Sequence, residues 1–509
     1  MENNGSLRVV VDNRLRFAAA DVPGWVIDAL KEQFTHVNPE YGKLQALGYW
    51  AGKVPRFYQT WQLRGGEMSV PRGGARKLRA LLEEAGVRFH YDVRVCDGTT
   101  HAFPPHNFPD GGKLSAFQVA AVDDLIAKQN CVVRSPTGSG KTSMAIAAIS
   151  KIGRTALVMV WTGALLKQWV ERIEQELRIP RREVGVVGLG RKFALKPITV
   201  AMQQSVYSIF QKGEMEAQQL IGYFGVLVCD ELQRFAARTF IGAVDPFRCR
   251  YRLGFSADET RADNKEFLIY DEFGEVAVDI ERDGLVDMGF ILDVDVRVVP
   301  SEFAADWYHD EFLEDGTPNP NLHNHKVLLD QMCADPVRNE LVARVVKMAA
   351  DEGGVMVFSH RVDHCQLIDQ ACVKQEIKSG LMLGGAEWSH AFDETKAGLK
   401  GGTLRVGIGT FQAIGQAIDV PAVSRGVMAT PVNNNRQMFG QVRGRMCRAN
   451  RAGSTSAVLY YVWDHRIFGL KTLRNLMQWN NNVSVLAGDG WTSAKQYVED
   501  AQRAARLFG

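Results

Sequence analysis

Short apolar runs alternate with longer amphipathic stretches from about residue 113 onward. The runs are rich in β-branched residues, and the stretches between them repeat apolar positions every three or four residues, as in LLKQWVERIEQEL at 165–177. Strands that alternate with helices favour a parallel sheet with crossover connections. The strands expected in the first part are CVVRS, ALVMVW, ITVAM and GVLVCDE, which begin at residues 131, 156, 198 and 225.

The same pattern returns in residues 297–509. GVMVFSH, LRVGIGT, RGVMAT and AVLYYVWD read as its strands, and an acidic connector rich in Pro and Asn precedes them at 305–321. We therefore predict two consecutive α/β domains, 113–296 and 297–509, each built on a parallel sheet.

Residues 1–112 have a different pattern. LRVVVD at 7–12 alternates like a strand, Pro23–Phe34 has helical spacing, and GGARKLRALLEEAG at 73–86 ends a helical stretch on Gly86. The turn-rich HAFPPHNFPDGG at 101–112 resembles a linker. These features predict a small N-terminal α+β domain.

Composition narrows the class of protein. Hydrophobic residues make up 46% and charged residues 23% of the 509 residues, which excludes extensive disorder. The formal net charge is +2, so any nucleic-acid-binding surface must be local. Residues 53–94 are a candidate for such a surface. This segment contains nine Lys/Arg and only four Asp/Glu, and aromatic residues are interleaved with them. A solvated helix face with a few core aromatics explains this segment as well.

The pattern of cysteines and of apolar segments indicates the cellular compartment of the protein. The eight cysteines are scattered and none forms a C-x-x-C pair, which favours buried free thiols in a reducing compartment. The first residues have no apolar core of a signal peptide, and no apolar run of about 18 residues occurs. We expect a cytoplasmic protein with no membrane span.

A phosphate-binding loop follows the strand that begins at Cys131. Ser135–Thr142 reads S-P-T-G-S-G-K-T and fits G-x-x-x-x-G-K-[ST], except that Ser135 replaces the first Gly. The two glycines let backbone N–H groups approach phosphates, and the following helix adds its positive end. The predicted nucleotide contacts are Pro136, Thr137, Gly138, Ser139, Gly140, Lys141 and Thr142, with Lys141 on the β- and γ-phosphates and Thr142 on Mg²⁺.

A second strand supplies carboxylates for the same site. GVLVCDELQ ends in Asp230 and Glu231, roughly ninety residues after the loop. Asp230 is expected to hold Mg²⁺, and Glu231 to polarise the water that attacks the γ-phosphate. The sequence therefore predicts an ATP site that uses Mg²⁺.

With these motifs in place, residues 113–465 resemble helicase superfamily 2, with its motifs in order. DELQ is similar to the family's D-E-x-H box, with Gln233 at the histidine position. IGTFQAIGQAIDVP, from Ile408, is similar to its motif five. QVRGRMCR, at Gln441–Arg448, is similar to the Q-x-x-G-R-x-x-R of its motif six. FRCRYRL and VMVFSHRVDH resemble the XPB/UvsW-like branch. The resemblance implies two RecA-like lobes behind a small N-terminal accessory domain that binds DNA.

The resemblance also implies roles for residues. Gln118 would read the adenine edge, and Arg445 and Arg448 would reach the γ-phosphate, where guanidinium groups stabilise transition-state charge. Further nucleotide contacts implied are Gly415, Asp419 and Gln441. Nucleic-acid contacts implied by motif position are Thr162, Gln168, Gln204, Ser205, Arg361, Thr410, Gln412 and Gln416; capping or strand-end solvation is the alternative role for each.

Two departures from the family pattern bear on function. Asp258 replaces the hydroxyl residue of an S-A-T segment that is thought to couple hydrolysis to strand separation, and Gln233 replaces a histidine but still hydrogen-bonds. The sequence thus predicts an ATP-dependent helicase or remodelling motor acting on branched or duplex DNA, with single-stranded DNA and recombination or repair proteins as further partners. The alternatives are a duplex translocase, an RNA helicase and a non-catalytic ATP-gated clamp. A metabolic P-loop kinase does not account for motifs five and six.

Overall fold

The chain forms two compact units in a computed structural model. One comprises Met1–Pro136 and Gly140–Arg282, and the other comprises Asp283–Gly509 together with Thr137–Ser139. The structure describes residues 6–46, 48, 50, 52, 54–190, 193–213, 215–234, 237–257, 264–308, 324–385, 387–417, 423–432, 436–446 and 456–508.

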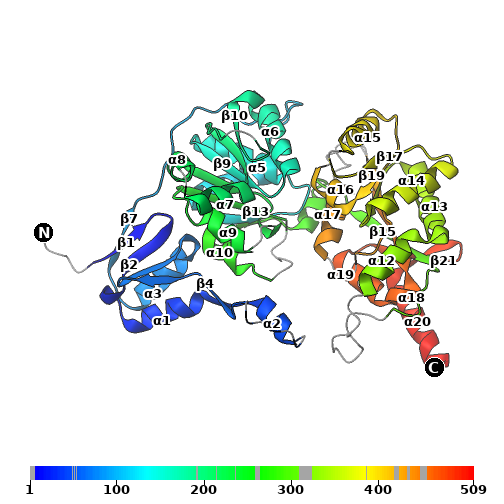
Figure 1. Ribbon diagram of the computed structural model, residues 1–509, viewed down its shortest axis with the longest axis horizontal. Coiled ribbons are helices and arrows are strands. Elements are labelled where there is room, and N and C mark those ends of the chain that lie inside the picture. The colour runs from blue at the N-terminus through cyan, green and yellow to red at the C-terminus, as the bar shows by residue number, and fades with distance from the viewer. Residues whose placement is uncertain are drawn as a thin grey trace. The chain divides into compact units, whose positions relative to one another are not determined.

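The N-terminal domain is a five-stranded sheet with two helices on one face (Figure 1). Its strands are β1 (Leu7–Val11), β2 (Arg14–Ala18), β5 (Gln62–Arg64), β6 (Glu67–Pro71) and β7 (Phe89–Val93), in the order β5-β6-β2-β1-β7. Apolar residues of alternate strand positions pack against α1 (Gly24–Gln33) and α3 (Ala75–Glu84). A hairpin of β3 (Thr35–Val37) and β4 (Phe57–Gln59) carries α2 (Pro39–Ala46). The expected strand and both expected helices are present, but most of the short strands were not predicted.

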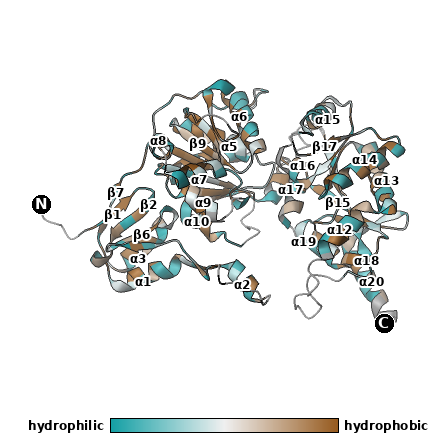
Figure 2. Ribbon diagram, in the orientation of Figure 1, coloured by the Kyte–Doolittle hydropathy of each residue, from teal (hydrophilic) through white to brown (hydrophobic). Residues whose placement is uncertain are grey.

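The first lobe is built on a seven-stranded sheet in which every pairing is parallel. The strand order is β10-β11-β9-β12-β13-β8-β14. The strands are β8 (Asn130–Arg134), β9 (Ala156–Val160), β10 (Val184–Val187), β11 (Ile198–Met202), β12 (Val226–Cys229), β13 (Tyr251–Ser256) and β14 (Val276–Asp279). The four strands expected here are β8, β9, β11 and β12, and Figure 2 shows strands of this sheet in hydrophobic colours.

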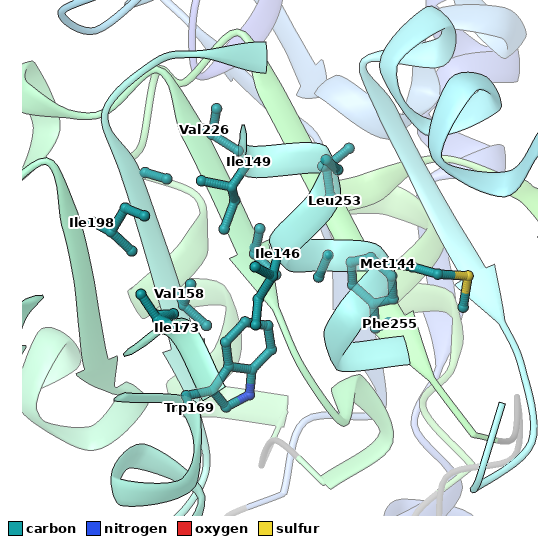
Figure 3. Close-up of a cluster of buried hydrophobic side chains, with 14 of the residues drawn as sticks. Met144, Ile146, Ile149, Val158, Trp169, Ile173, Ile198, Val226, Leu253 and Phe255 are labelled. Atoms are coloured by element: carbon teal, nitrogen blue, oxygen red, sulfur yellow. The ribbon is translucent and has the colours of Figure 1, made fainter. Parts of the chain in front are cut away.

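Helices cover both faces of this sheet because its strands are apolar on both sides. In β12, Val226 and Val228 face one core and Leu227 and Cys229 face the other. The first core lies under α4 (Ala116–Lys128), α5 (Lys141–Ile152) and α6 (Gly163–Leu177), and is drawn in Figure 3. The second lies under α7 (Gln203–Lys212), α8 (Met215–Tyr223), α9 (Ala237–Val244) and α10 (Phe267–Phe273).

The second lobe has an eight-stranded sheet in the order β17-β18-β16-β19-β20-β15-β21-β22. Its strands are β15 (Val294–Ser301), β16 (Gly354–Ser359), β17 (Ser379–Met382), β18 (Val406–Thr410), β19 (Val423–Met428), β20 (Ala457–Asp464), β21 (Val483–Ala487) and β22 (Gly490–Ser493). Its helices include α12 (Asn324–Ala334), α13 (Pro336–Glu352), α14 (Val362–Lys374), α15 (Ser389–Gly401), α16 (Phe411–Ala417), α17 (Arg436–Met446), α19 (Lys471–Trp479) and α20 (Ala494–Phe508). All pairings are parallel except that of β21 with β22. This confirms the predicted fold class of two parallel-sheet lobes and a small N-terminal α+β domain.

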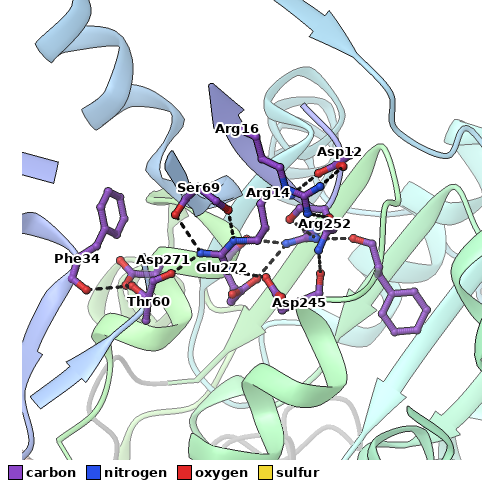
Figure 4. A network of polar contacts seen from close by, with 12 residues as sticks. Asp12, Arg14, Arg16, Phe34, Thr60, Ser69, Asp245, Arg252, Asp271 and Glu272 are labelled. Carbon is purple, nitrogen blue, oxygen red and sulfur yellow. Dashed lines mark hydrogen bonds and ion pairs between the residues drawn. The ribbon is translucent and has the colours of Figure 1, made fainter. Parts of the chain in front are cut away.

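A buried network of charges fixes the N-terminal domain to the first lobe (Figure 4). Arg14 of β2 donates to Asp245 at 2.8 Å, and Arg252 of β13 donates to Glu272 of α10 at 3.0 Å and to the backbone carbonyl of Asn13 at 3.0 Å. Thr60 Oγ1 donates to Asp271 at 2.6 Å. Burial and the nearby Asp245 raise the pKa of Glu272, while Arg252 opposes them. The accessory domain is therefore part of the first compact unit.

The segment expected to be a linker, residues 101–112, lies packed on the first lobe. His106 Nε2 is 2.8 Å from the buried carboxylate of Glu176, Asn107 N donates to the Glu176 carbonyl at 3.0 Å, and His101 N donates to the Gly153 carbonyl at 2.9 Å. The segment was predicted to be a linker because its sequence is rich in turn residues. Hydrogen bonds made by backbone groups do not depend on residue type, so the sequence does not reveal them. Residue 297, the expected start of the second lobe, lies within β15.

Two further findings concern the whole described chain. Among the described residues, no helix is long and apolar enough to cross a membrane. The seven cysteines that the structure describes are free thiols, six of them buried and Cys96 half-buried. The eighth, Cys447, lies outside the described residues.

Candidate nucleotide-binding site

The loop between β8 and α5 has the backbone that phosphate binding requires. Gly138 and Gly140 have φ of 101° and 88°, in the left-handed region that glycine tolerates. A Cβ on Gly140 would lie 2.3 Å from Gln118 Nε2, so a larger residue would displace that side chain. Lys141 Nζ donates to the Ser135 carbonyl at 2.8 Å and to the Pro136 carbonyl at 3.3 Å. Thr142 follows in the first turn of α5, and Ser139 is buried.

Gln118 lies beside this loop, at the start of α4. Its Oε1 accepts a hydrogen bond from Ser115 N at 3.0 Å in a capping box, and its side chain is buried. The structure thus places Gln118 beside the phosphate-binding loop. Its reading of adenine remains a prediction.

The predicted carboxylates stand at the carboxyl end of β12, separated from β8 in the sheet by β13. Asp230 is 4% exposed, and its Oδ2 accepts a hydrogen bond from the indole Nε1 of Trp169 at 2.8 Å. Glu231 has φ of 56°, an uncommon conformation for a residue with a side chain that is found at functional turns. Gln233 Nε2 donates to Glu231 Oε2, and Ser256 Oγ, at the end of β13, donates to Gln233 Oε1 at 2.6 Å.

Electrostatics at this edge are dominated by burial. Burial and, after it, the neighbouring Glu231 raise the pKa of Asp230 to about 6, although the Trp169 N–H and the Lys141 ammonium favour the charged carboxylate. A divalent cation would favour the charged form in the same way.

The donor set fits Mg²⁺ bound together with a nucleotide. Thr142 offers a hydroxyl and Asp230 a carboxylate, and Mg²⁺ is commonly held by one or two such oxygens with substrate phosphates and water. Within the described part of the chain no group of three or more His, Cys, Asp or Glu is placed to hold a metal by itself. The residues present therefore suit a metal that arrives with phosphates.

The nucleic-acid contacts expected in the first lobe lie at helix starts. Thr162 Oγ1 caps α6 by accepting from Leu165 N at 3.3 Å, and Gln168 is half-buried one turn further along that helix. Gln204 and Ser205 lie in the first turn of α7 and line a hollow with Gly188. Thr162 has the capping role that was its alternative; the nucleic-acid roles of all four remain predictions.

The contacts expected in the second lobe are described in part. Arg361 precedes α14 and is 2.9 Å from Asp330, Thr410 Oγ1 accepts from Ala413 N at 3.2 Å, and Gln412 lies in α16. Gly415 lies in α16 and Gln441 in α17. The side chains of Gln416 and Arg445, and the residues Asp258, Asp419 and Arg448, lie outside what the structure describes. Their predicted roles are unchanged.

Sequence reasoning missed two residues that touch the predicted catalytic groups. Trp169 packs in the core, and its N–H also reaches Asp230. Ser256 lies two residues before Asp258, in the S-A-T segment, and only the structure shows that its hydroxyl contacts Gln233. A buried indole N–H needs an acceptor, and that rule was the available signal for Trp169.

Comparisons with known proteins find relatives of this chain that are named helicases and translocases. Residues 112–261 match the family described as "Type III restriction enzyme, res subunit". The chain is 27% identical over 213 residues to "DNA 3'-5' helicase XPB" of Mycobacterium tuberculosis, covering 40% of this chain and 38% of the relative. It is 22% identical over 382 residues to "Probable helicase D10" of Escherichia phage T5, covering 74% and 76%. The chain spans less than two fifths of each of the first four curated relatives.

Solved structures share the fold. A Saccharomyces cerevisiae Dbp5 L327V structure bound to RNA and ADP BeF3 aligns with a TM-score of 0.53 and 13% identity, over 78% of this chain and 94% of that one. At this identity the likeness concerns the fold alone, a pair of α/β lobes.

Proposed function

We propose that the chain is a superfamily 2 helicase of the XPB/UvsW-like type, an ATP-dependent motor that moves on or unwinds branched or duplex DNA. The motor acts in recombination or repair, alongside proteins of those processes, in the cytoplasm of a bacterial or phage-infected cell. Its ATP site is the carboxyl edge of the first-lobe sheet.

The single observation that carries this proposal is the convergence of Lys141, Asp230 and Glu231 at that edge. They come from two elements almost ninety residues apart, and the Lys141 ammonium acts on the Asp230 carboxylate. A phosphate loop alone would suit many nucleotide-binding proteins. A buried carboxylate, Asp230, with a half-buried one, Glu231, directly after it is what hydrolysis of a γ-phosphate needs.

Each residue has a distinct task in this proposal. The N–H groups of the loop and of the first turn of α5 bind the phosphates, and Lys141 leaves the Ser135 and Pro136 carbonyls to bind the terminal ones. Glu231 orients the attacking water and accepts its proton, while Gln233 holds the Glu231 carboxylate in place. Thr142 and Asp230 would hold Mg²⁺, which when bound would supply positive charge to the phosphate oxygens.

Duplex translocation without strand separation is the second candidate. A Sulfurisphaera tokodaii relative, 29% identical over 177 residues, is named "DNA 3'-5' translocase XPB2". Asp258, a carboxylate at the hydroxyl position of the S-A-T segment, also favours it.

The test is ATP hydrolysis and strand displacement with single-stranded DNA, plain duplex, a four-way junction and structured RNA. Lys141→Ala is compared with Lys151→Ala, a control at the other end of the same helix, where the lysine is exposed and pairs with Asp123. Junction-stimulated hydrolysis and displacement, lost only in Lys141→Ala, support the motor. Stimulation by duplex without displacement favours the translocase, and stimulation by RNA alone contradicts a DNA motor. If the chain binds nucleotide but hydrolyses none under any condition, the motor proposal fails and an ATP-gated clamp is favoured.

A further inference from the structure

Helix α6 presents one face to both halves of the candidate metal site. Trp169, Arg172 and Glu176 are spaced three and four residues apart, so they lie on the same side of the helix. Trp169 Nε1 donates to Asp230 Oδ2 at 2.8 Å. Arg172 Nη2 donates to Ser143 Oγ at 2.7 Å, and Ser143 Oγ donates to Glu176 Oε1 at 3.3 Å. Ser143 directly follows Thr142, so α6 contacts the surroundings of both predicted magnesium ligands.

The Trp169 contact differs from the others because it reaches a predicted ligand itself. The side chain is 1% exposed and Asp230 is 4% exposed, so water does not compete for this hydrogen bond. A donor on one carboxylate oxygen fixes the rotation of the group and directs the other oxygen elsewhere. Hydrogen bonds to charged groups are also stronger than those between neutral groups.

The α6 helix is itself held firmly. Arg172 pairs with Glu176 at 2.6 Å, and His106 Nε2 from the packed segment 101–112 lies 2.8 Å from the other Glu176 oxygen. The Trp169 ring packs in the first-lobe core beside Ile146, Val158 and Ile173 (Figure 3). The indole N–H therefore has one fixed direction, as an orienting donor requires.

We propose that Trp169 is a positioning residue that orients Asp230 for the magnesium ion bound with the nucleotide. This inference rests on the proposed ATP site. The competing view is that the Trp169 ring only fills the core and that its N–H takes the nearest acceptor. The two views differ in one measurable property, the dependence of nucleotide binding on Mg²⁺.

The experiment titrates MgCl₂ into the full chain with a fluorescent, non-hydrolysable ATP analogue, and repeats the binding in EDTA. Trp169→Phe keeps the apolar ring and removes the N–H. Trp463→Phe is the matched control, since Trp463 is also buried but donates to the backbone carbonyl of Gly469 in the second lobe. We expect Trp169→Phe to raise the midpoint of the Mg²⁺ titration by about tenfold while binding in EDTA stays unchanged. Trp463→Phe should match the wild type in both.

A double-mutant cycle adds a second readout. In an Asp230→Asn background the ligand is already altered, so Trp169→Phe should shift the Mg²⁺ midpoint no further. An unchanged midpoint in Trp169→Phe overturns the proposal, as does an equal loss of binding with and without Mg²⁺. The same shift in the Asp230→Asn background also overturns it. If the wild type shows no Mg²⁺-dependent binding, the proposed ATP site itself fails, a result distinct from these.

Discussion

The ends of β8 and β12 in the first lobe and the end of β16 in the second lobe carry different chemistry. In the first lobe, the ends of β8 and β12 bring together a lysine and two adjacent carboxylates, Lys141, Asp230 and Glu231. In the second lobe, β16 ends at Ser359, whose Oγ is 2.8 Å from His364 Nδ1, and His364 Nε2 is 2.9 Å from Asn339 Oδ1. The charged groups at the first edge are those predicted to meet a nucleotide, whereas the groups at the end of β16 satisfy one another through neutral hydrogen bonds.

The pKa values show the same contrast. Burial lowers the pKa of His364 to about 3 and that of His360 to about 4, so both rings are neutral at pH 7. The Asp230 carboxylate, with a pKa of about 6, is mostly charged at that pH despite burial. A buried charge is costly unless it has partners, so the first edge is arranged for a ligand that supplies them. The groups at the end of β16 already satisfy one another, while Arg361 and Thr410 near the same edge keep their predicted nucleic-acid roles.

The largest effect should come from the first edge. Glu231→Gln removes the proton acceptor while preserving the size of the side chain. We expect ATP hydrolysis to fall by about 100- to 10 000-fold with nucleotide binding retained. Steady-state hydrolysis and binding of a fluorescent ATP analogue check this together. Hydrolysis within tenfold of the wild type would remove Glu231 from the chemistry.

The next effect concerns the second lobe. Arg338 of α13 donates to Asp464 Oδ1 at 2.7 Å, and the two side chains are 1% and 0% exposed. Arg338→Met leaves Asp464 buried without its partner, so the lobe should lose about 3–5 kcal/mol of stability. Chemical denaturation measures the loss. Arg466→Ala, which breaks an exposed pair with Glu302, is the control and should leave the transition nearly unchanged. Equal effects from both variants would contradict the account.

A smaller effect is the response of the second lobe to pH. The folded pKa of His364 lies below its unfolded value of about 6.5, so its contribution is complete above pH 6.5 and is lost as pH falls toward about 3. In this window the slope should be about 1.4 kcal/mol per pH unit for this residue. The nearby charged or titratable groups are Arg338, His360, Arg361 and His325. Denaturation of the wild type and His364→Gln at pH 7, 6 and 5 checks this; an identical pH slope in the variant would contradict it.

The smallest effect is expected at Ser256. Ser256→Ala removes the donor to Gln233 and so loosens the side chain that holds Glu231. One hydrogen bond is worth about 1 kcal/mol, so hydrolysis should fall about fivefold, with the KM for ATP little changed. Steady-state kinetics separate the two parameters. A change confined to KM would assign Ser256 to binding.

Prediction from sequence succeeded where the signal was local. The strands β8, β12 and β20 are short, continuous apolar runs and the helix α6 has a clear helical period. The loop at Ser135–Thr142 is one continuous motif. The short strands of the N-terminal domain have only weak hydrophobic patterns. The hairpin of β21 and β22 was not predicted, because its strands are short and β21 forms part of the sheet by pairing with β15, which is distant in sequence.

The contacts that shape the site could not be predicted, because they join residues distant in sequence. Trp169 lies 61 residues from Asp230, and Ser256 lies 23 residues from Gln233. Nothing in either local sequence specifies the partner, which depends on the strand order of the sheet. The buried contacts of His106 were hidden for the same reason, within a segment that reads as a connector.

The most direct test of the difference between the two edges is a crystal structure of the chain with Mg²⁺ and a non-hydrolysable ATP analogue. We predict that the phosphates lie against the loop at Ser135–Thr142, with Mg²⁺ between Thr142 and Asp230 and with Trp169 Nε1 still donating to Asp230. Phosphates bound at the second-lobe edge, beside His360 and Thr430, or a metal that does not contact Asp230 directly or through water, would contradict the account.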